Sequence, residues 1–325
     1  MPSPFAIDPG ADRPEQDAMG SVANKIAKKI AAQGRSKVID LAAWREGKEI
    51  VREAGLDDDR VAHLLSKDCD PCLAPYVFGQ NVASILSEQI SLMKEAKGYV
   101  KTVGDAEDVY MPGGPPMSPL TVSYFSMWSL FDVRFGSSRE TMGTCILRAA
   151  QEFDFPPWLS DIIGSMQQSR MGFYVHCGRD GELVRLREVG TQDTTTCRVP
   201  AGFAGRPGQI WFVRLLPPPS GSYSHHIVCI TPYVIESYPE QAFVDYLERE
   251  LARMEAKKTL KTDNHHGHLL KYGPHSNHWN EYILCAYTGH QHEAVFLTGI
   301  PDIQDSLPHA ADNQLVQPDS GMTLH

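Results

Sequence analysis

Histidine is concentrated in one short part of this sequence, and histidine is the side chain that most readily binds metals or transfers protons near neutral pH. Seven of the thirteen histidines lie between His265 and His292. We therefore expect any metal or proton chemistry of the protein to be found in this histidine-rich stretch.

The spacing within the stretch fits a zinc site. A helix is predicted over residues 276–286, and in it His278 and Glu281 lie three positions apart on one face. Imidazole and carboxylate groups are ordinary zinc ligands, and His290 and His292 are spaced so that both rings face one side of a strand. The predicted metal ligands are His275, His278, Glu281, His290 and His292.

A zinc ion held there would favour a metal-dependent hydrolase, with Glu281 or Glu293 serving as the general base. The stretch matches neither HExxH nor paired CxxC motifs. The alternative interpretation is that these histidines cap helices, pair with carboxylates or face solvent.

A second pair with chemical potential is Cys69-Asp-Pro-Cys72, whose CxPC spacing is that of thioredoxin-like redox motifs. Redox chemistry of that kind requires a strand leading into the motif, whereas residues 61–65 have a helical pattern. With His63 the pair could instead form half of a zinc site, or it could be structural.

Arginine dominates the basic residues of the segment 170–235, which contains no lysine. Arg185 and Arg187 alternate with Val184 and Leu186, so both are expected on the solvent-facing side of one strand. Guanidinium groups bind carboxylates or phosphates in a bidentate manner. The predicted binding residues are Arg185, Arg187, Arg198 and Arg214. The alternative is that these arginines pair with the chain's own acidic residues.

Bulk properties exclude several classes of function. The 325 residues carry 30 Lys plus Arg against 40 Asp plus Glu, a formal charge of −10, which makes nucleic acid an unfavourable partner for the chain as a whole. No stretch has the ~20 apolar residues of a membrane span, and no signal peptide is evident. The chain has seven cysteines, and an odd number cannot all pair in disulfides within one chain. This count is typical of a protein whose thiols are reduced. We expect a soluble, cytoplasmic protein.

The pattern along the chain predicts an α+β fold. Residues 1–20 are expected to form a disordered leader, and residues 21–170 a helical domain that includes a helix over 157–168 and a Ser137–Glu140 capping box. Residues 171–236 read as a small antiparallel β unit of SH3 or OB size, with a hairpin turn at Arg179-Asp-Gly181. Residues 237–325 are expected to form a helical and irregular region packed on the β unit.

These patterns favour a non-enzymatic binding or regulatory protein whose β unit presents an arginine-bearing face to an anionic partner, such as another protein. No GxSxG, Walker A or GxGxxG motif points to a hydrolase elbow or a nucleotide site. Two alternatives stay open: a zinc-dependent hydrolase that uses residues 265–293, and a structural subunit of a larger assembly. The sequence leaves the oligomeric state undetermined.

Overall fold

The computed structural model describes most of the chain between residues 21 and 297. The described residues are 21–33, 72–110, 119–153, 155–218, 224–229, 231–235, 238–256, 264–273, 287–290 and 294–297. The predicted leader, the helical pattern at residues 61–65 and the helix predicted over 276–286 lie outside them.

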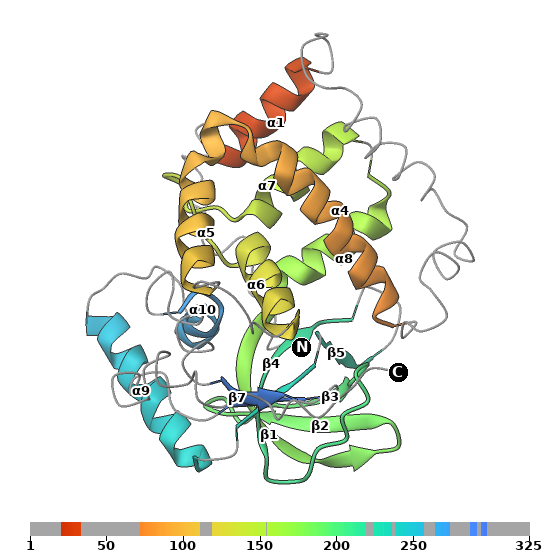
Figure 1. Cartoon of the computed structure of the whole chain (residues 1–325), viewed down its shortest axis with the longest axis vertical. Helices are drawn as coiled ribbons and strands as arrows, with labels where there is room; N and C mark the ends of the chain where they lie inside the picture. Colours follow the sequence, from red (N-terminus) through yellow and green to blue (C-terminus); the bar gives the residue numbers. More distant parts are fainter. Residues whose placement is uncertain are drawn as a thin grey trace, which may run out of the picture.

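The first half of the described chain is helical. Its elements are α1 (Val22–Gln33), α4 (Ala74–Ser91), η1 (Lys94–Ala96), α5 (Lys97–Tyr110), α6 (Pro119–Phe131), α7 (Met142–Ala149), η2 (Ala150–Phe153) and α8 (Pro157–Gln168). They pack around one apolar core to which Phe131, Ile146 and Ile163 contribute fully buried side chains. Figure 1 shows these helices stacked above the β-strands.

Local chemistry explains where several of these helices begin. Two of them, α6 and α8, start at proline, which lacks the N–H that a first helical turn leaves unbonded. The Thr141 hydroxyl accepts a hydrogen bond from the backbone N–H of Thr144 at 3.1 Å and so caps α7. The predicted Ser137–Glu140 capping box is therefore wrong. Phe135 and Glu140 instead bridge a tight turn ahead of the helix.

In the described part of the chain, eight strands form a single sheet, part of which closes on itself. The strands are β1 (Arg170–Asp180), β2 (Leu183–Glu188), β3 (Thr194–Arg198), β4 (Ile210–Leu216), β5 (His226–Val228), β6 (Tyr233–Ile235), β7 (Tyr287–His290) and β8 (Val295–Leu297). Their order is β1-β2-β3-β5-β4-β6-β8-β7, and a further pairing between β1 and β4 closes the first five into a barrel.

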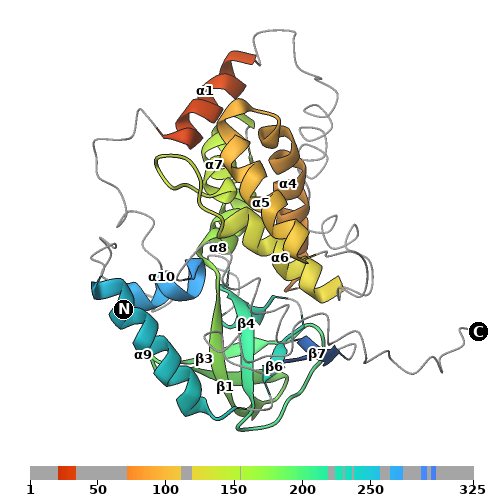
Figure 2. The same ribbon diagram turned by 60° about the vertical axis from the view of Figure 1, so that its left-hand side comes forward.

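The barrel interior is filled by apolar side chains, among them Val184, Leu186, Trp211 and Val213. The alternate residues of β1 and β4, including Phe173 and Phe212, face outward and are also buried, because two helices cover them. These helices are α9 (Glu240–Ala256) and α10 (His265–Tyr272). Figure 2 shows α9 and α10 beside the barrel, with α10 near the foot of the helical half.

The predicted α+β architecture is confirmed: helices precede and follow a small β-barrel. The Arg179–Gly181 turn joins β1 to β2, with Gly181 at a φ of 60°, a value that glycine adopts readily. The barrel is mixed rather than wholly antiparallel, since β3 and β5 are parallel neighbours. Within the described part of the chain, no helix has both the length and the apolar character needed to cross a membrane.

Candidate functional site

The outward side of β2 and β3 carries the arginine surface expected from the sequence. Val184 and Leu186 point into the barrel, so Arg185 and Arg187 point away from it. On β3, Thr196 lies opposite Arg185 and Thr194 opposite Arg187. We call Arg185, Arg187, Arg198, Thr194 and Thr196 the arginine face.

Arg185 is the most accessible member of the arginine face. Its side chain is exposed, and among the described residues its guanidinium contacts a backbone carbonyl, that of Cys177 at 3.5 Å, and no carboxylate. A guanidinium in this state keeps further N–H donors for a bidentate pair of hydrogen bonds to an incoming anion.

Arg187 and Arg198 already hold carboxylates of the same chain. Arg187 binds both oxygens of Glu240, at the start of α9, at 2.7 and 2.8 Å. Arg198 binds Glu182 at 2.8 Å. Hydrogen bonding from Arg187 lowers the pKa of Glu240, although partial burial opposes the shift. Both ion pairs are partly exposed, so each contributes roughly 0.2 to 1 kcal/mol and can exchange with other anions.

Arg214, predicted to belong to the same surface, lies elsewhere. It is 1% exposed, and its guanidinium binds Asp132 at 2.7 and 3.0 Å and the Ser169 hydroxyl at 2.7 Å. Its strand β4 is buried along its whole length, between the barrel interior and the covering elements. Arg214 therefore belongs to an internal polar network and faces no external partner.

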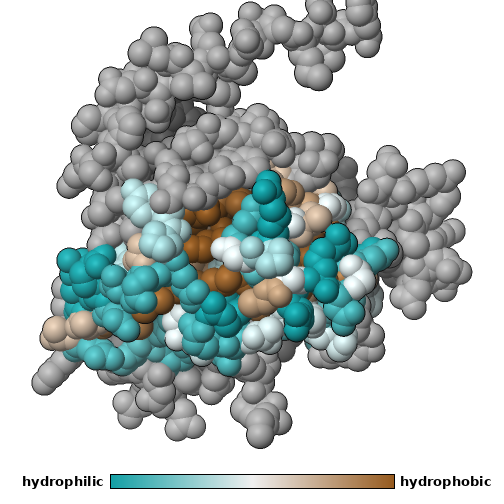
Figure 3. Space-filling view, turned by 90° about the horizontal axis from the view of Figure 1, so that it is seen from below, coloured by the Kyte–Doolittle hydropathy of each residue, from teal (hydrophilic) through white to brown (hydrophobic). Residues whose placement is uncertain are grey.

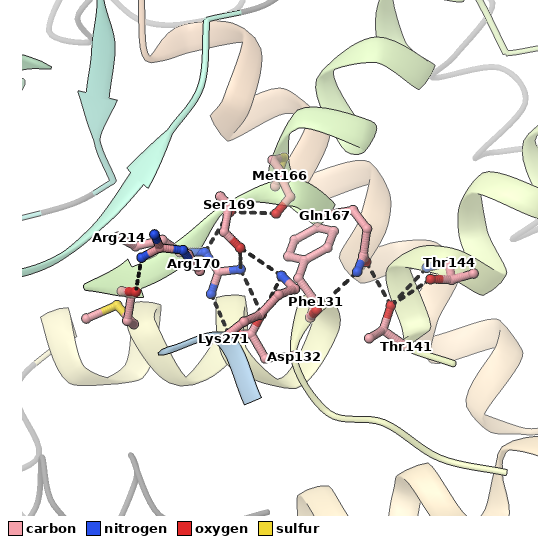
Figure 4. A network of polar contacts seen from close by, with 11 residues as sticks. Phe131, Asp132, Thr141, Thr144, Met166, Gln167, Ser169, Arg170, Arg214 and Lys271 are labelled. Atoms are coloured by element: carbon pink, nitrogen blue, oxygen red, sulfur yellow. Dashed lines mark hydrogen bonds and ion pairs between the residues drawn. The ribbon is translucent and has the colours of Figure 1, made fainter. Parts of the chain in front are cut away.

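This network joins four segments that are distant in sequence (Figure 4). Lys271 of α10 donates to Asp132 at 2.9 Å and to the Ser169 carbonyl at 2.7 Å. Asp132 follows α6, Ser169 lies between α8 and β1, and Arg214 is on β4. Two cations thus share one carboxylate, which gives this buried cluster a net charge of +1. Burial lowers the pKa of Lys271 to about 8, although Asp132 opposes the shift.

A second buried ion pair lies at the start of the barrel. Arg170 binds both oxygens of Glu188 at 2.5 and 3.0 Å, and Thr191 donates to the same carboxylate at 3.0 Å. His266 of α10 approaches Glu188 at 3.7 Å. Burial alone would raise the pKa of Glu188, but Arg170 and His266 hold it at about 2.

Neither of the two buried networks was predicted from the sequence. The signal for the first was an arginine inside the apolar run QIWFVRLL, since a buried charge needs a partner.

The charged side chains of these buried networks are already bonded to one another. Lys271 is 1% exposed, and its ammonium is already bonded to Asp132 and Ser169. The hollow beside Ser169, Arg170 and Tyr174 measures about 230 Å³, part of it open solvent. This is below the roughly 300 to 1,000 Å³ of most ligand pockets. The arginine face is the more accessible site.

Most of the predicted metal ligands fall outside the described residues. These are His275, His278, Glu281 and His292, and of His290 only its place in β7 is described. Within the described ranges, no group of three or more His, Cys, Asp or Glu side chains is arranged to hold a metal ion. The zinc site and the zinc-dependent hydrolase remain predictions.

The cysteine pair is only partly described. Cys72 is half-buried and packs against the core of the helical half, while Cys69 and His63 lie outside the described residues. Neither the redox nor the zinc interpretation of this pair is tested by these contacts.

No protein-family model, curated protein or solved structure matches this chain. The candidate site therefore has to be judged on its own chemistry. Figure 3 views the molecule from the end where the barrel and α9 lie, and the coloured surface there is largely polar around a central hydrophobic area. The arginine face belongs to the strands at this end of the molecule (Figure 1).

Proposed function

We propose that this protein is a binding protein that holds an acidic segment of another protein on its arginine face. The observation that carries the proposal is Arg185, an exposed guanidinium that meets no carboxylate among the described residues and lies two positions from Arg187 on the same strand. Two guanidinium groups at this spacing suit carboxylates that alternate along an extended peptide.

The composition of the two strands favours a protein partner over a nucleic acid. Single-stranded nucleic acids are held by aromatic side chains on which the bases stack. The strands β2 and β3, LVRLRE and TTTCR, contain no aromatic residue. The formal charge of −10 also opposes a long phosphate backbone more than a short acidic segment.

The ion pairs already on the face are compatible with binding. A partner carboxylate would replace Glu240 on Arg187 or Glu182 on Arg198, so one half-exposed ion pair would be exchanged for another. The hydroxyls of Thr194 and Thr196 lie opposite the two β2 arginines and can donate to the same partner.

Fluorescence anisotropy with a fluorescein-labelled octaglutamate peptide tests the proposal. We expect the double variant R185E/R187E to bind at least about tenfold more weakly. It loses two surface ion pairs, each worth up to about 1 kcal/mol, and places two like charges against the peptide. The matched control is K97E/K101E, which makes the same charge change at exposed positions of α5. It should bind like the unaltered protein.

The chelator EDTA should leave this binding unchanged, since no metal takes part in it. Equal weakening by both double variants would show that only the net charge matters, and the proposal would fail. It would fail equally if the unaltered protein bound octaglutamate no better than octaglutamine.

A further inference from the structure

The helix α10 lies where the helical half, the barrel and α9 meet. Leu269 and Leu270 are fully buried in the apolar layer that covers the outer side of β1 and β4. Lys271 ties the same helix to Asp132, which follows α6. One short helix of eight residues, HHGHLLKY, therefore contacts both halves of the molecule.

The contact between His268 and Arg134 fixes the protonation state of the imidazole. Arg134 Nη1 lies 2.9 Å from His268 Nε2. A guanidinium has only hydrogen-bond donors, so this nitrogen must carry a lone pair and His268 must be neutral. Arg134 is held in place from a second direction, with its guanidinium 4.1 Å from the centre of the Tyr272 ring.

The described charges around His268 that shift its pKa all oppose a second proton. Arg134 and Arg139 reach it from the segment after α6, and His265 reaches it along its own helix. The carboxylates that approach α10 are bound to other residues: Asp132 to Lys271, Glu188 to His266 and Glu255 to His265. An imidazolium at position 268 would lie against the Arg134 guanidinium at the 2.9 Å contact, where the two like charges repel each other.

We propose that α10 is an acid-sensitive latch, which stays docked while His268 is neutral and is released when His268 takes up a proton. Release uncovers the outer side of β1 around Phe173 and frees Lys271 from Asp132. The latch does not depend on the binding function proposed above for the arginine face.

The size of the effect follows from the two states of the imidazole. Burial, and then Arg134 and Arg139, lower the pKa of His268 to about 3 in the docked helix, against about 6.5 when it is free in water. At a pH between these two pKa values, His268 therefore binds a proton in the released form but not in the docked form. Lowering the pH from 7 to 5 should raise the equilibrium constant for release about 25-fold.

Hydrogen exchange of peptides covering residues 264–273, corrected for the intrinsic effect of pH on amide exchange, measures this release in the full chain. The matched variant is His268→Gln, because glutamine can accept from Arg134 but does not titrate. We expect the exchange of the unaltered protein to rise about 25-fold between pH 7 and pH 5, and that of the variant to rise much less. Equal increases in both proteins would overturn the latch, since His266 and Glu188 are present in both.

A second variant keeps the proposal testable if His268→Gln does not fold. In Arg134→Gln the amide still donates to the imidazole but carries no charge, so protonation of His268 becomes less unfavourable in the docked state. The pH-dependent increase in exchange should then be smaller than in the unaltered protein. An unchanged increase would count against the Arg134–His268 contact as the sensor.

Discussion

The carboxylate of Asp132 holds the guanidinium of Arg214 in a bidentate pair, at 2.7 and 3.0 Å, and both side chains are almost entirely buried. Lys271 binds the same carboxylate at 2.9 Å. The pair joins the end of α6 to β4, and the lysine adds α10. At this contact between the helical half and the barrel, one carboxylate thus pairs with two cations.

This arrangement predicts unequal effects of removing the partners. Asp132→Asn leaves Arg214 and Lys271 buried without a counter-charge, so we expect the free energy of unfolding to fall by about 3 to 5 kcal/mol. Lys271→Met leaves the Asp132–Arg214 pair intact and removes the surplus charge, so its effect should stay within about 1 kcal/mol or be stabilising. Urea unfolding of the two variants measures the difference, and similar losses in both would contradict this account.

The second prediction concerns His226, on β5. Burial and then His225 lower its pKa to about 4 in the folded protein, against 6.5 for an unperturbed histidine. Below pH 6.5 the unfolded chain binds a proton that the folded chain does not, so stability is full above pH 6.5 and falls as the pH approaches 4. The loss should reach about 2 to 3 kcal/mol. His226→Phe should remove this part of the pH dependence in unfolding curves measured between pH 7 and pH 4.

Competition on the arginine face gives a third prediction. Because Glu240 is the carboxylate partner of Arg187, Glu240→Gln should leave this guanidinium with neutral acceptors such as Gln192. Octaglutamate binding should then tighten about two- to fivefold, which corresponds to a surface ion pair of ~0.4 to 1 kcal/mol. The control is Asp105→Asn, which breaks the exposed Lys101–Asp105 pair on α5 and should leave binding unchanged. Weaker binding by Glu240→Gln would mean that Glu240 positions Arg187 and does not compete for it.

Two helical glycines provide a fourth prediction, about packing. A Cβ atom at Gly79 of α4 would lie 2.7 Å from Ile162 Cγ2 of α8, so Gly79→Ala should cost about 1 to 3 kcal/mol through overpacking. A Cβ at Gly164 of α8 would meet no described atom within 4 Å, so Gly164→Ala should stabilise the protein by about 0.5 to 1 kcal/mol. Thermal unfolding of both variants should show shifts of opposite sign.

Features set by neighbouring residues could be predicted from the sequence. The helix at Pro157–Gln168 has its predicted bounds, because proline at its start and a helical apolar period lie within the segment itself. The Arg179–Gly181 turn and the outward alternation of Arg185 and Arg187 were also recognisable, since a strand repeats every two residues. The local sequence was thus enough to predict the α+β class and two members of the arginine face.

What only the tertiary structure decided is which charges are buried. Arg214 and Arg185 both lie on barrel strands, but β4 is covered on both sides, whereas the outer side of β2 is not. The partner that makes burial of Arg214 tolerable is Asp132, 82 residues away, and the cation that keeps His268 neutral is Arg134, 134 residues away. Such pairings leave no local pattern, because the free energy of a buried charge depends on groups that only folding brings beside it.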